Sequence, residues 1–202
     1  MSEFLAYLQL GFEHITDSKG YDHILFIIAL CTVYTLVEWK KVVILVTAFT
    51  LGHSITLALA TLRLVTVNPD FIELLIPVTI VITAAVNFSY KQKTRVSKES
   101  SNGAYSRYFL ALLFGLIHGL GFSNYLRALL GKEADIFAPL LGFNIGLELG
   151  QLIIVFFTLT VAFILIEIIR VSRVTWVHVL SGIIAGMALS LIINNKFLPT
   201  LI

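Results

Sequence analysis

Three histidines and one glutamate stand out because the stretches around them contain few other ionisable side chains. His23, His53 and His118 occur in "DHILF", "LGHSI" and "LIHGL", and Glu148 occurs in "GLELG". Imidazole binds zinc, nickel, copper and iron, and carboxylates complete many such sites. We therefore predict a site for a divalent transition metal with His23, His53, His118 and Glu148 as ligands.

Neighbouring residues could hold or deliver the ion. Asp22 precedes His23 and is predicted either as a further ligand or as a carboxylate that orients the imidazole, with a helix N-cap as the structural alternative. Glu13 and His14 lie nearer the N-terminus, where they are either solvated surface groups or an outer site that feeds the deeper one. The residues alone leave these choices open.

The composition indicates where these side chains must lie. Hydrophobic residues make up 58% of the chain and charged residues 13%, with a mean hydropathy of +0.94, whereas soluble domains carry about 25% charged residues. Residues 1–202 are therefore expected to form a single integral-membrane domain in the lipid bilayer. A net charge of +2 without a basic patch argues against nucleic acid as a partner. The single cysteine, Cys31, argues against disulfides and thiolate metal sites.

Six apolar runs separated by charged or turn-forming segments predict an all-α, multi-pass bundle of about six transmembrane helices. The acidic segment before the first run lacks a cleavage site, so it is predicted to form a short amphipathic or re-entrant lead-in. The predicted spans are residues 22–37, 42–62, 71–90, 108–128, 139–169 and 176–193.

The distribution of lysine and arginine predicts the orientation of these spans. Nine basic residues fall on one side and five on the other, and the richer side faces the cytoplasm by the positive-inside rule. Both termini are then outside. The nine are Lys40, Lys41, Lys91, Lys93, Arg95, Lys98, Arg107, Arg170 and Arg173, and the five are Lys19, Arg63, Arg127, Lys132 and Lys196.

Depth in the bilayer follows from the helical rise of about 1.5 Å per residue. His53 and His118 each lie eleven residues from the predicted cytoplasmic end of their span, which places both about 17 Å deep. His23 lies about 21 Å from the end of the first span, and Glu148 about 14 Å from the other end of the fifth. All four side chains are thus predicted to share one layer near the midplane.

Glycines at four-residue spacing predict close helix contacts. Gly142, Gly146 and Gly150 form two such steps, and the pairs Gly115–Gly119 and Gly182–Gly186 form one each. In a bilayer this spacing lets two backbones approach closely. The glycines around His118 therefore place its imidazole in a packed interior, and glycine-rich helices could also join copies of the chain in a homo-oligomer.

Several of these polar residues have a purely structural alternative. A lone membrane histidine can simply hydrogen-bond a neighbouring helix, as can Asn144 and Gln151. The other residues to which we assign structural roles are Thr79, Thr83 and Asn87, which share one helix face suited to packing, and His178, predicted to be an interfacial anchor.

Four stretches, in order along the chain, resemble the HupE/UreJ family of bacterial membrane proteins: "GFEHITDSKGYDHILF", "FTLGHSITL", "FGLIHGLGF" and "FNIGLELGQ". The resemblance implies a nickel or cobalt permease, or a hydrogenase or urease accessory protein, in the bacterial inner membrane. Seven residues separate His14 from the Asp22–His23 pair, a longer spacing than in the nickel-permease pattern. The chain is therefore similar to a divergent branch of the family.

Two functions suit these residues. A permease would hold a nickel, cobalt or zinc ion near the midplane and needs a path to both membrane faces. A membrane-embedded zinc-type hydrolase needs only an outward-open site, with Glu148 or Asp22 as general base, although no HExxH motif is present. A structural or sensory metal site is a third possibility and predicts a closed shell of ligands.

Overall fold

The computed structural model describes residues 3–18, 20–91, 101–130 and 136–198, and within these ranges it contains helices and no strand. Five helices, α3 to α7, are long and apolar enough to cross a bilayer, and α2 is a shorter apolar helix. The predicted all-α membrane bundle is confirmed. The elements are α1 (Glu3–Thr16), α2 (Asp22–Cys31), the 3-10 turn η1 (Leu36–Glu38), α3 (Trp39–Thr61), α4 (Pro69–Phe88), α5 (Ser101–Leu130), α6 (Phe137–Phe163), the π turn η2 (Ile164–Ile168) and α7 (Arg173–Ile193).

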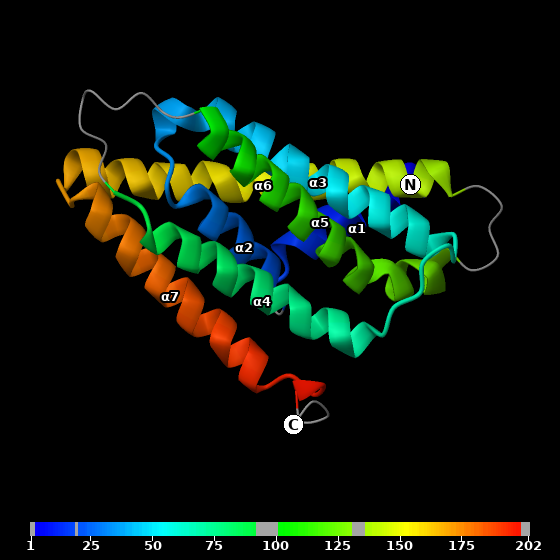
Figure 1. The fold of residues 1–202 in the computed structure, drawn as a ribbon. Coiled ribbons are helices and arrows are strands. Elements are labelled where there is room, and N and C mark those ends of the chain that lie inside the picture. Colours follow the sequence, from blue (N-terminus) through cyan, green and yellow to red (C-terminus); the bar gives the residue numbers. More distant parts are fainter. Residues whose placement is uncertain (1–2, 19, 92–100, 131–135, 199–202) are drawn as a thin grey trace.

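The helices pack mainly as three pairs around α2. Helix α3 packs on α5, α1 on α6, and α4 on α7, while α2 contacts α4, α6 and α7 (Figure 1). Local signals set several boundaries: Asn68 caps α4 by accepting a hydrogen bond from the backbone N–H of Asp70 at 2.9 Å, and Ser172 caps α7 in the same way from Thr175 at 3.0 Å. The predicted ends of the five long spans therefore lie close to those observed.

The first span differs from its prediction, because α1 and α2 are two short helices that follow one another across the bundle (Figure 1). Helix α1 runs along the first half of α6, from Phe4 beside Gly142 to Thr16 beside Gly150. Helix α2 begins in the middle of the bundle and ends at Cys31, six residues before the predicted end at Val37. Their lengths, about 21 Å and 15 Å by the helical rise, together suffice for one crossing. The predicted lead-in is thus part of the bundle.

The early end of α2 is stabilised by side chains that are distant in sequence. The last carbonyls of a helix have no partner within the helix, and such groups are costly where water is absent. Side chains of α4 and α7 donate hydrogen bonds to one carbonyl oxygen in the last turn of α2 and to those of the two residues that follow Cys31. The bonds run from Asn87 Nδ2 to Ala29 O at 2.8 Å, from Trp176 Nε1 to Thr32 O at 3.1 Å and from Arg173 Nη2 to Val33 O at 2.6 Å.

The predicted glycine contacts form in two of the three places. A Cβ atom on Gly115 or Gly119 would collide with the backbone of α3, and one on Gly146 would collide with the backbone of α1. Gly186, in contrast, has no neighbouring atom within 4 Å of a built Cβ among the described residues, and Gly182 meets only the tip of Phe88 at 4.0 Å. A homo-oligomer through the glycines of α7 stays a prediction.

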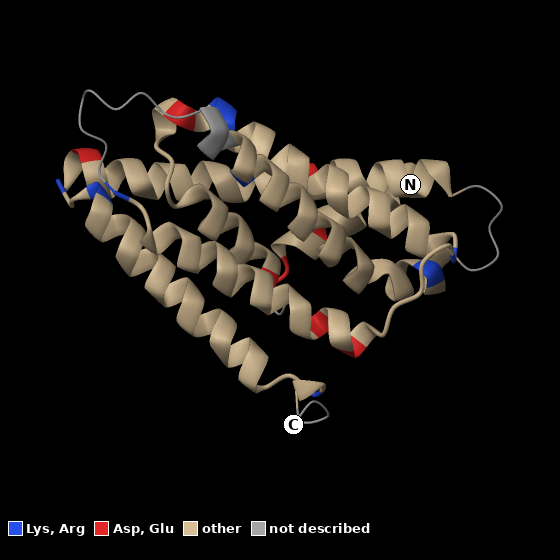
Figure 2. Cartoon of the chain, viewed as in Figure 1, with Lys and Arg blue, Asp and Glu red and all other residues tan. Residues whose placement is uncertain are grey.

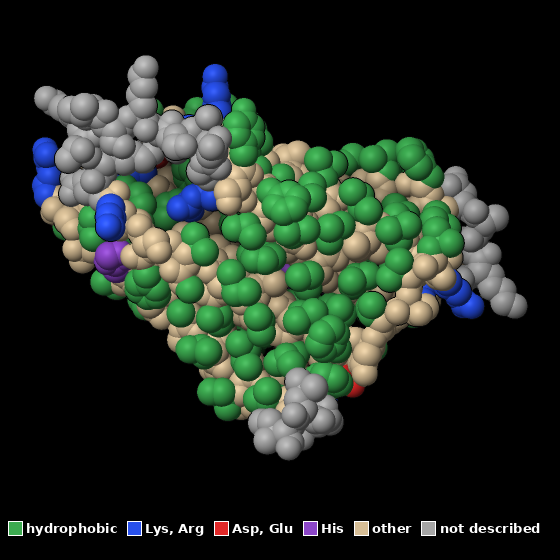
Figure 3. Space-filling view, in the orientation of Figure 1, with side chains coloured by type: hydrophobic (Ala, Val, Ile, Leu, Met, Phe, Trp, Pro, Cys, Tyr) green, Lys and Arg blue, Asp and Glu red, His purple; other side chains and the backbone are tan. Residues whose placement is uncertain are grey.

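Most lysines and arginines lie at the ends of the bundle, whereas acidic residues lie both at the ends and in the middle (Figure 2). Hydrophobic side chains cover the face between the ends (Figure 3). Lys40, Lys41, Arg107, Arg170 and Arg173 lie at or near the end where α3, α5 and α7 begin. Arg63 and Arg127 lie at the opposite end. Five of the basic residues used to predict orientation lie outside the described residues: Lys19, Lys93, Arg95, Lys98 and Lys132.

Candidate metal centre

The break between α1 and α2 brings two histidines together. His14 lies in the last turn of α1, and His23 is the second residue of α2. The end of α1 and the start of α2 therefore lie close together. The two ring centroids are 4.7 Å apart. Because α1 and α2 point away from this junction in opposite directions, both imidazoles reach the middle of the bundle.

The third histidine comes from α3, at the point where α5 packs most closely. Gly119 of α5 lies against the carbonyl oxygen of His53, and Gly115 lies against that of Phe49. The missing side chains let the two backbones touch there, which fixes the position of α3 in the bundle. His53 is fully buried, and its ring stacks on that of Phe143 with centroids 6.2 Å apart.

His14, His23 and His53 form what we call the three-histidine group, in which one ring nitrogen from each lies within 4.8 Å of the others. Zinc–nitrogen bonds of about 2.0–2.1 Å set the nitrogens of a tetrahedral site about 3.3 Å apart, so movements of up to about 1.5 Å would close the group around an ion. Nε2 of all three histidines and Nδ1 of His53 are buried without a hydrogen-bond partner among the described residues. An unpartnered buried polar group costs about 1–3 kcal/mol, which a bound metal would offset.

Asp22 is placed to orient one of these ligands. Its Oδ1 lies 2.9 Å from Nδ1 of His23 and accepts a hydrogen bond from the backbone N–H of the same residue at 2.8 Å. A carboxylate on one ring nitrogen fixes the tautomer, so Nε2 is left with a lone pair for a metal. Of the roles predicted for Asp22, this geometry favours orientation of the imidazole over direct ligation. The N-cap alternative is wrong, because Tyr21 holds the N-cap position and Asp22 is the first residue of α2.

His118 lies beside the three-histidine group. Its ring centroid is 5.2 Å from that of His23, and its Nε2 lies 3.1 Å from the hydroxyl oxygen of Thr79. Phe26 and Phe49 pack on the ring with centroids 5.0 and 5.1 Å away, and Nδ1 has no partner among the described residues. His118 is thus a fourth imidazole within reach of the group, and Thr79 contacts it as well as packing in the core.

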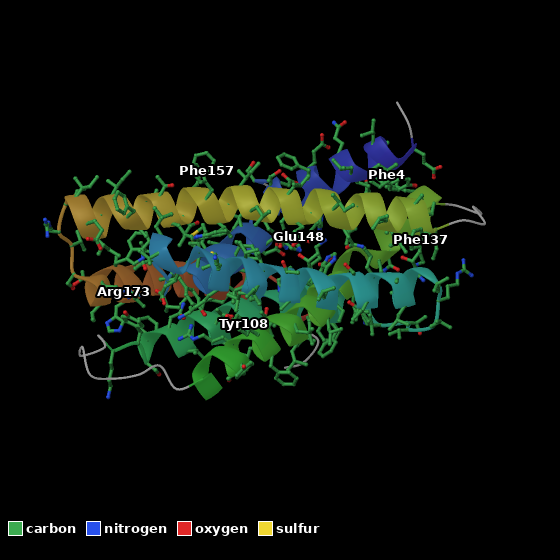
Figure 4. All side chains as sticks on the ribbon, turned by 90° about the horizontal axis from the view of Figure 1, so that it is seen from above. Phe4, Tyr108, Phe137, Glu148, Phe157 and Arg173 are labelled. Carbon is green, nitrogen blue, oxygen red and sulfur yellow. The ribbon has the colours of Figure 1, made fainter. Side chains whose placement is uncertain are left out.

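Glu148 lies elsewhere. Its carboxylate accepts a hydrogen bond from the hydroxyl of Thr47 at 2.6 Å, on the side of α6 that faces α3 (Figure 4). Gln151 pairs with Thr50 across the same interface at 2.9 Å, whereas Asn144 donates to the carbonyl oxygen of Leu140 in its own helix. Glu148, which we predicted as a ligand, therefore contacts α3 and is not a member of the three-histidine group.

His14 is the group member that the sequence left unassigned. On one continuous helix, nine residues would put His14 and His23 on opposite faces and about 13.5 Å apart along the axis. The chain break between α1 and α2 is therefore what brings them together. Gly20 and the polar residues just before it were the available signal, since such segments interrupt helices. Ring contacts with Phe122 at 4.0 Å and Phe143 at 5.7 Å hold His14 against α5 and α6.

A cavity reaches the histidines from one end of the bundle. It has a volume of about 200 Å³ and is lined by His14, His23, His118, Asp17, Asp22 and Glu73 among others. Two larger cavities, of about 520 and 500 Å³, share residues with it and add Glu13 and Lys196. Glu73 near the start of α4 and Tyr125 near the end of α5 place these openings towards the end that carries Arg63 and Arg127. We call the three cavities together the vestibule.

The carboxylates give the vestibule an acidic lining. Among the described residues that line the three cavities, four are acidic, Glu13, Asp17, Asp22 and Glu73, and one, Lys196, is a lysine or arginine. A narrow space lined by one sign of charge raises the local concentration of ions of the opposite sign. The arrangement can therefore concentrate cations beside buried imidazoles.

Comparison with known proteins agrees with the four sequence stretches. The chain matches the family model described as HupE / UreJ protein over residues 1–195, which include α1 to α7 and every candidate ligand. No curated protein and no solved structure matches the chain. With a match over nearly its whole length, and with the motif histidines gathered in one place, the chain belongs to the HupE/UreJ family.

Proposed function

We propose that the protein is a permease for a divalent transition metal, of the nickel, cobalt or zinc type, in the bacterial inner membrane. The observation that carries the proposal is the three-histidine group, whose nitrogens from α1, α2 and α3 lie within 4.8 Å of one another without hydrogen-bond partners on the facing atoms. Imidazole suits these ions better than it suits calcium or magnesium. His118 is the fourth nitrogen ligand, and Asp22 orients His23.

The acidic vestibule supports the uptake direction. With the predicted orientation, the end carrying Lys40, Lys41 and Arg173 faces the cytoplasm and both termini lie outside. The vestibule then opens outward, and its carboxylates attract a hydrated cation before the imidazoles replace its water. Broken helices that place ligands at mid-membrane are a common feature of transporter binding sites, and the break between α1 and α2 has this character.

The test is uptake into proteoliposomes loaded with a metal-sensitive dye, with nickel, cobalt and zinc offered in turn. His53→Ala removes a ligand without touching the vestibule, and we expect it to lower uptake at least tenfold. His178→Ala is the matched control, because His178 lies on α7 and contacts Phe88 at a ring distance of 5.8 Å. Equal uptake by wild type and His53→Ala would argue against the permease.

A membrane-embedded metalloenzyme is the second candidate, and the one-sided vestibule favours it. Three imidazoles with an open position for water form a hydrolytic zinc site, and such a site needs no inward path. Asp22 lines the vestibule and would be the nearest carboxylate to act as general base. If the protein binds one metal ion tightly per chain and takes up neither nickel, cobalt nor zinc, the result would favour this function over transport.

A further inference from the structure

A second polar group lies between α3 and α6, away from the openings of the vestibule. The atoms that join the two helices there are all oxygens. Thr47 Oγ1 donates to Glu148 Oε1 at 2.6 Å, and Thr50 Oγ1 lies 2.9 Å from Gln151 Oε1. Each pair joins α3 to α6. We call these four residues the α3–α6 polar group.

The α3–α6 polar group has hydrogen-bonding capacity that the protein does not use. Thr50 Oγ1 is within range of both the Val46 carbonyl oxygen, at 3.1 Å, and Gln151 Oε1, yet a hydroxyl has one proton to donate. Gln151 is fully buried, and its Nε2 has no partner among the described residues. A buried amide in this state costs about 1–3 kcal/mol. Turning the amide over would let Nε2 donate to Thr50 Oγ1 and would leave Oε1 as an acceptor for a proton or a cation.

Glu148 gives the α3–α6 polar group its charge. The residue lies in the middle of the most hydrophobic span, Phe137–Ile168, where an ionised carboxylate is expensive unless a cation accompanies it. The hydroxyl of Thr47 is neutral and leaves the charge uncompensated. Either a proton on the carboxylate or a small cation beside it would remove the cost of an unpaired negative charge in the membrane.

The donor chemistry separates the two sites. Carboxylate, hydroxyl and amide oxygens suit hard cations, whereas the imidazoles of the three-histidine group suit transition metals. Thr50 and Thr47 precede His53 on α3 by three and six residues, or about 4.5 and 9 Å of helical rise. The α3–α6 polar group therefore lies one to two turns from the metal ligands, towards the end with Lys40 and Lys41.

We propose that the α3–α6 polar group is the site of a coupling cation, Na⁺ or H⁺, whose binding at Glu148 drives metal transport through the three-histidine group. This inference rests on the proposed function and adds its energy source. Both sites share α3, so a shift of that helix changes the two together. Coupling of this kind requires that one ion changes the affinity or access of the other.

Other ionisable groups on the helices packed against α6 contribute to any pH dependence, so the test compares variants at each pH. These groups are Glu3, Glu13 and His14 on α1, Asp22 and His23 on α2, Glu38 on η1, Lys40, Lys41 and His53 on α3, and Glu167 on η2.

The experiment uses purified full-length protein in proteoliposomes with either a sodium gradient at equal pH or a pH gradient without sodium. Glu148→Gln keeps the size of the side chain and removes its charge. One of the two gradients is expected to accelerate metal uptake by the wild type. We expect Glu148→Gln to lower this gradient-driven uptake at least tenfold, while its equilibrium affinity for the metal changes less than threefold. Glu167→Gln changes an exposed acid in η2, which follows α6; it is the matched control and should transport like the wild type.

The alternatives give different results. Gradient-driven uptake that is unchanged in Glu148→Gln overturns the proposal, and so does loss of metal binding in Glu148→Gln, which would make Glu148 a metal ligand. Equal thermal stability of the purified variant and wild type in metal-free choline buffer at high pH establishes that the variant folds.

A separate measurement holds even if the permease function fails. The melting temperature of metal-free wild-type protein should rise in sodium relative to choline, or with falling pH, more than that of Glu148→Gln. Sodium-specific stabilisation identifies Na⁺, and a pH-dependent difference without a sodium effect identifies H⁺. Identical responses of the two proteins to sodium and to pH would remove the cation site whatever the protein transports.

Discussion

Asp22 Oδ1 lies 2.9 Å from Nδ1 of His23, and this contact leaves Nε2, which is buried without a partner among the described residues, as the ring nitrogen that can bind a metal. The two residues are adjacent in sequence and open α2, so the carboxylate and imidazole come into place as soon as that helix forms. A metal ligand held in this way keeps one tautomer and one ring orientation.

Removal of this carboxylate should weaken the site without emptying it. Asp22→Ala is expected to lower metal affinity by about 10–100-fold, the usual effect of deleting the carboxylate partner of a ligating histidine. Competition titration with a chelating dye measures the change. Asp70→Ala, at the exposed start of α4, is the control and should bind metal normally. An unchanged affinity in Asp22→Ala would show that His23 needs no orienting partner.

His14 supplies a second prediction, because its role depends on the break between α1 and α2. His14→Ala should reduce equilibrium metal affinity at least tenfold through loss of one of three nitrogen ligands. His178→Ala is the control. If His14 served only as a surface group, His14→Ala would bind metal as tightly as the wild type and as His178→Ala.

The glycine contact beside His53 predicts an effect on stability. Gly119→Ala places a Cβ against the carbonyl oxygen of His53 and should cost about 1–3 kcal/mol of unfolding free energy through overpacking. Gly186→Ala is the matched change on α7, where a Cβ meets no described atom within 4 Å. Thermal melting in detergent should show a lower midpoint for the first variant alone, and equal midpoints would refute close α3–α5 packing.

The hydrogen bond at the end of α2 predicts a further loss of stability. Trp176→Phe keeps most of the ring but leaves the Thr32 carbonyl oxygen without its donor, which should cost about 1–3 kcal/mol. Trp39→Phe changes a half-exposed tryptophan and should cost less. The same melting assay compares them. A larger effect at Trp39 would mean that the end of α2 does not depend on this bond.

The long helices were predictable because each contains an apolar run of sufficient length, and α4 and α7 also begin at a local cap, Asn68 and Ser172. The end of α2 was not, since the residues that follow Cys31 remain apolar. Asn87 bonds a carbonyl in the last turn of α2, and Trp176 and Arg173 bond the carbonyls of Thr32 and Val33 just after it, so side chains far away in sequence stabilise this end.

The candidate site shows a similar limit. Counting the helical rise gives depth in the bilayer, and the three motif histidines do lie near one another. Depth does not give direction around the helix axis, however. The depth of Glu148 predicted that it would join the layer of histidines, but its carboxylate is bonded to Thr47 on α3. Only the folded arrangement of α1 and α2 reveals His14.

Binding of a divalent transition metal by the three-histidine group can be measured by equilibrium dialysis of the purified protein against nickel, cobalt or zinc, followed by elemental analysis. His53→Ala and His178→Ala are dialysed in parallel. We expect one ion per chain in the wild type and in His178→Ala, and a loss of that ion in His53→Ala. Equal metal content in His53→Ala and the wild type would show that the three-histidine group does not bind the ion.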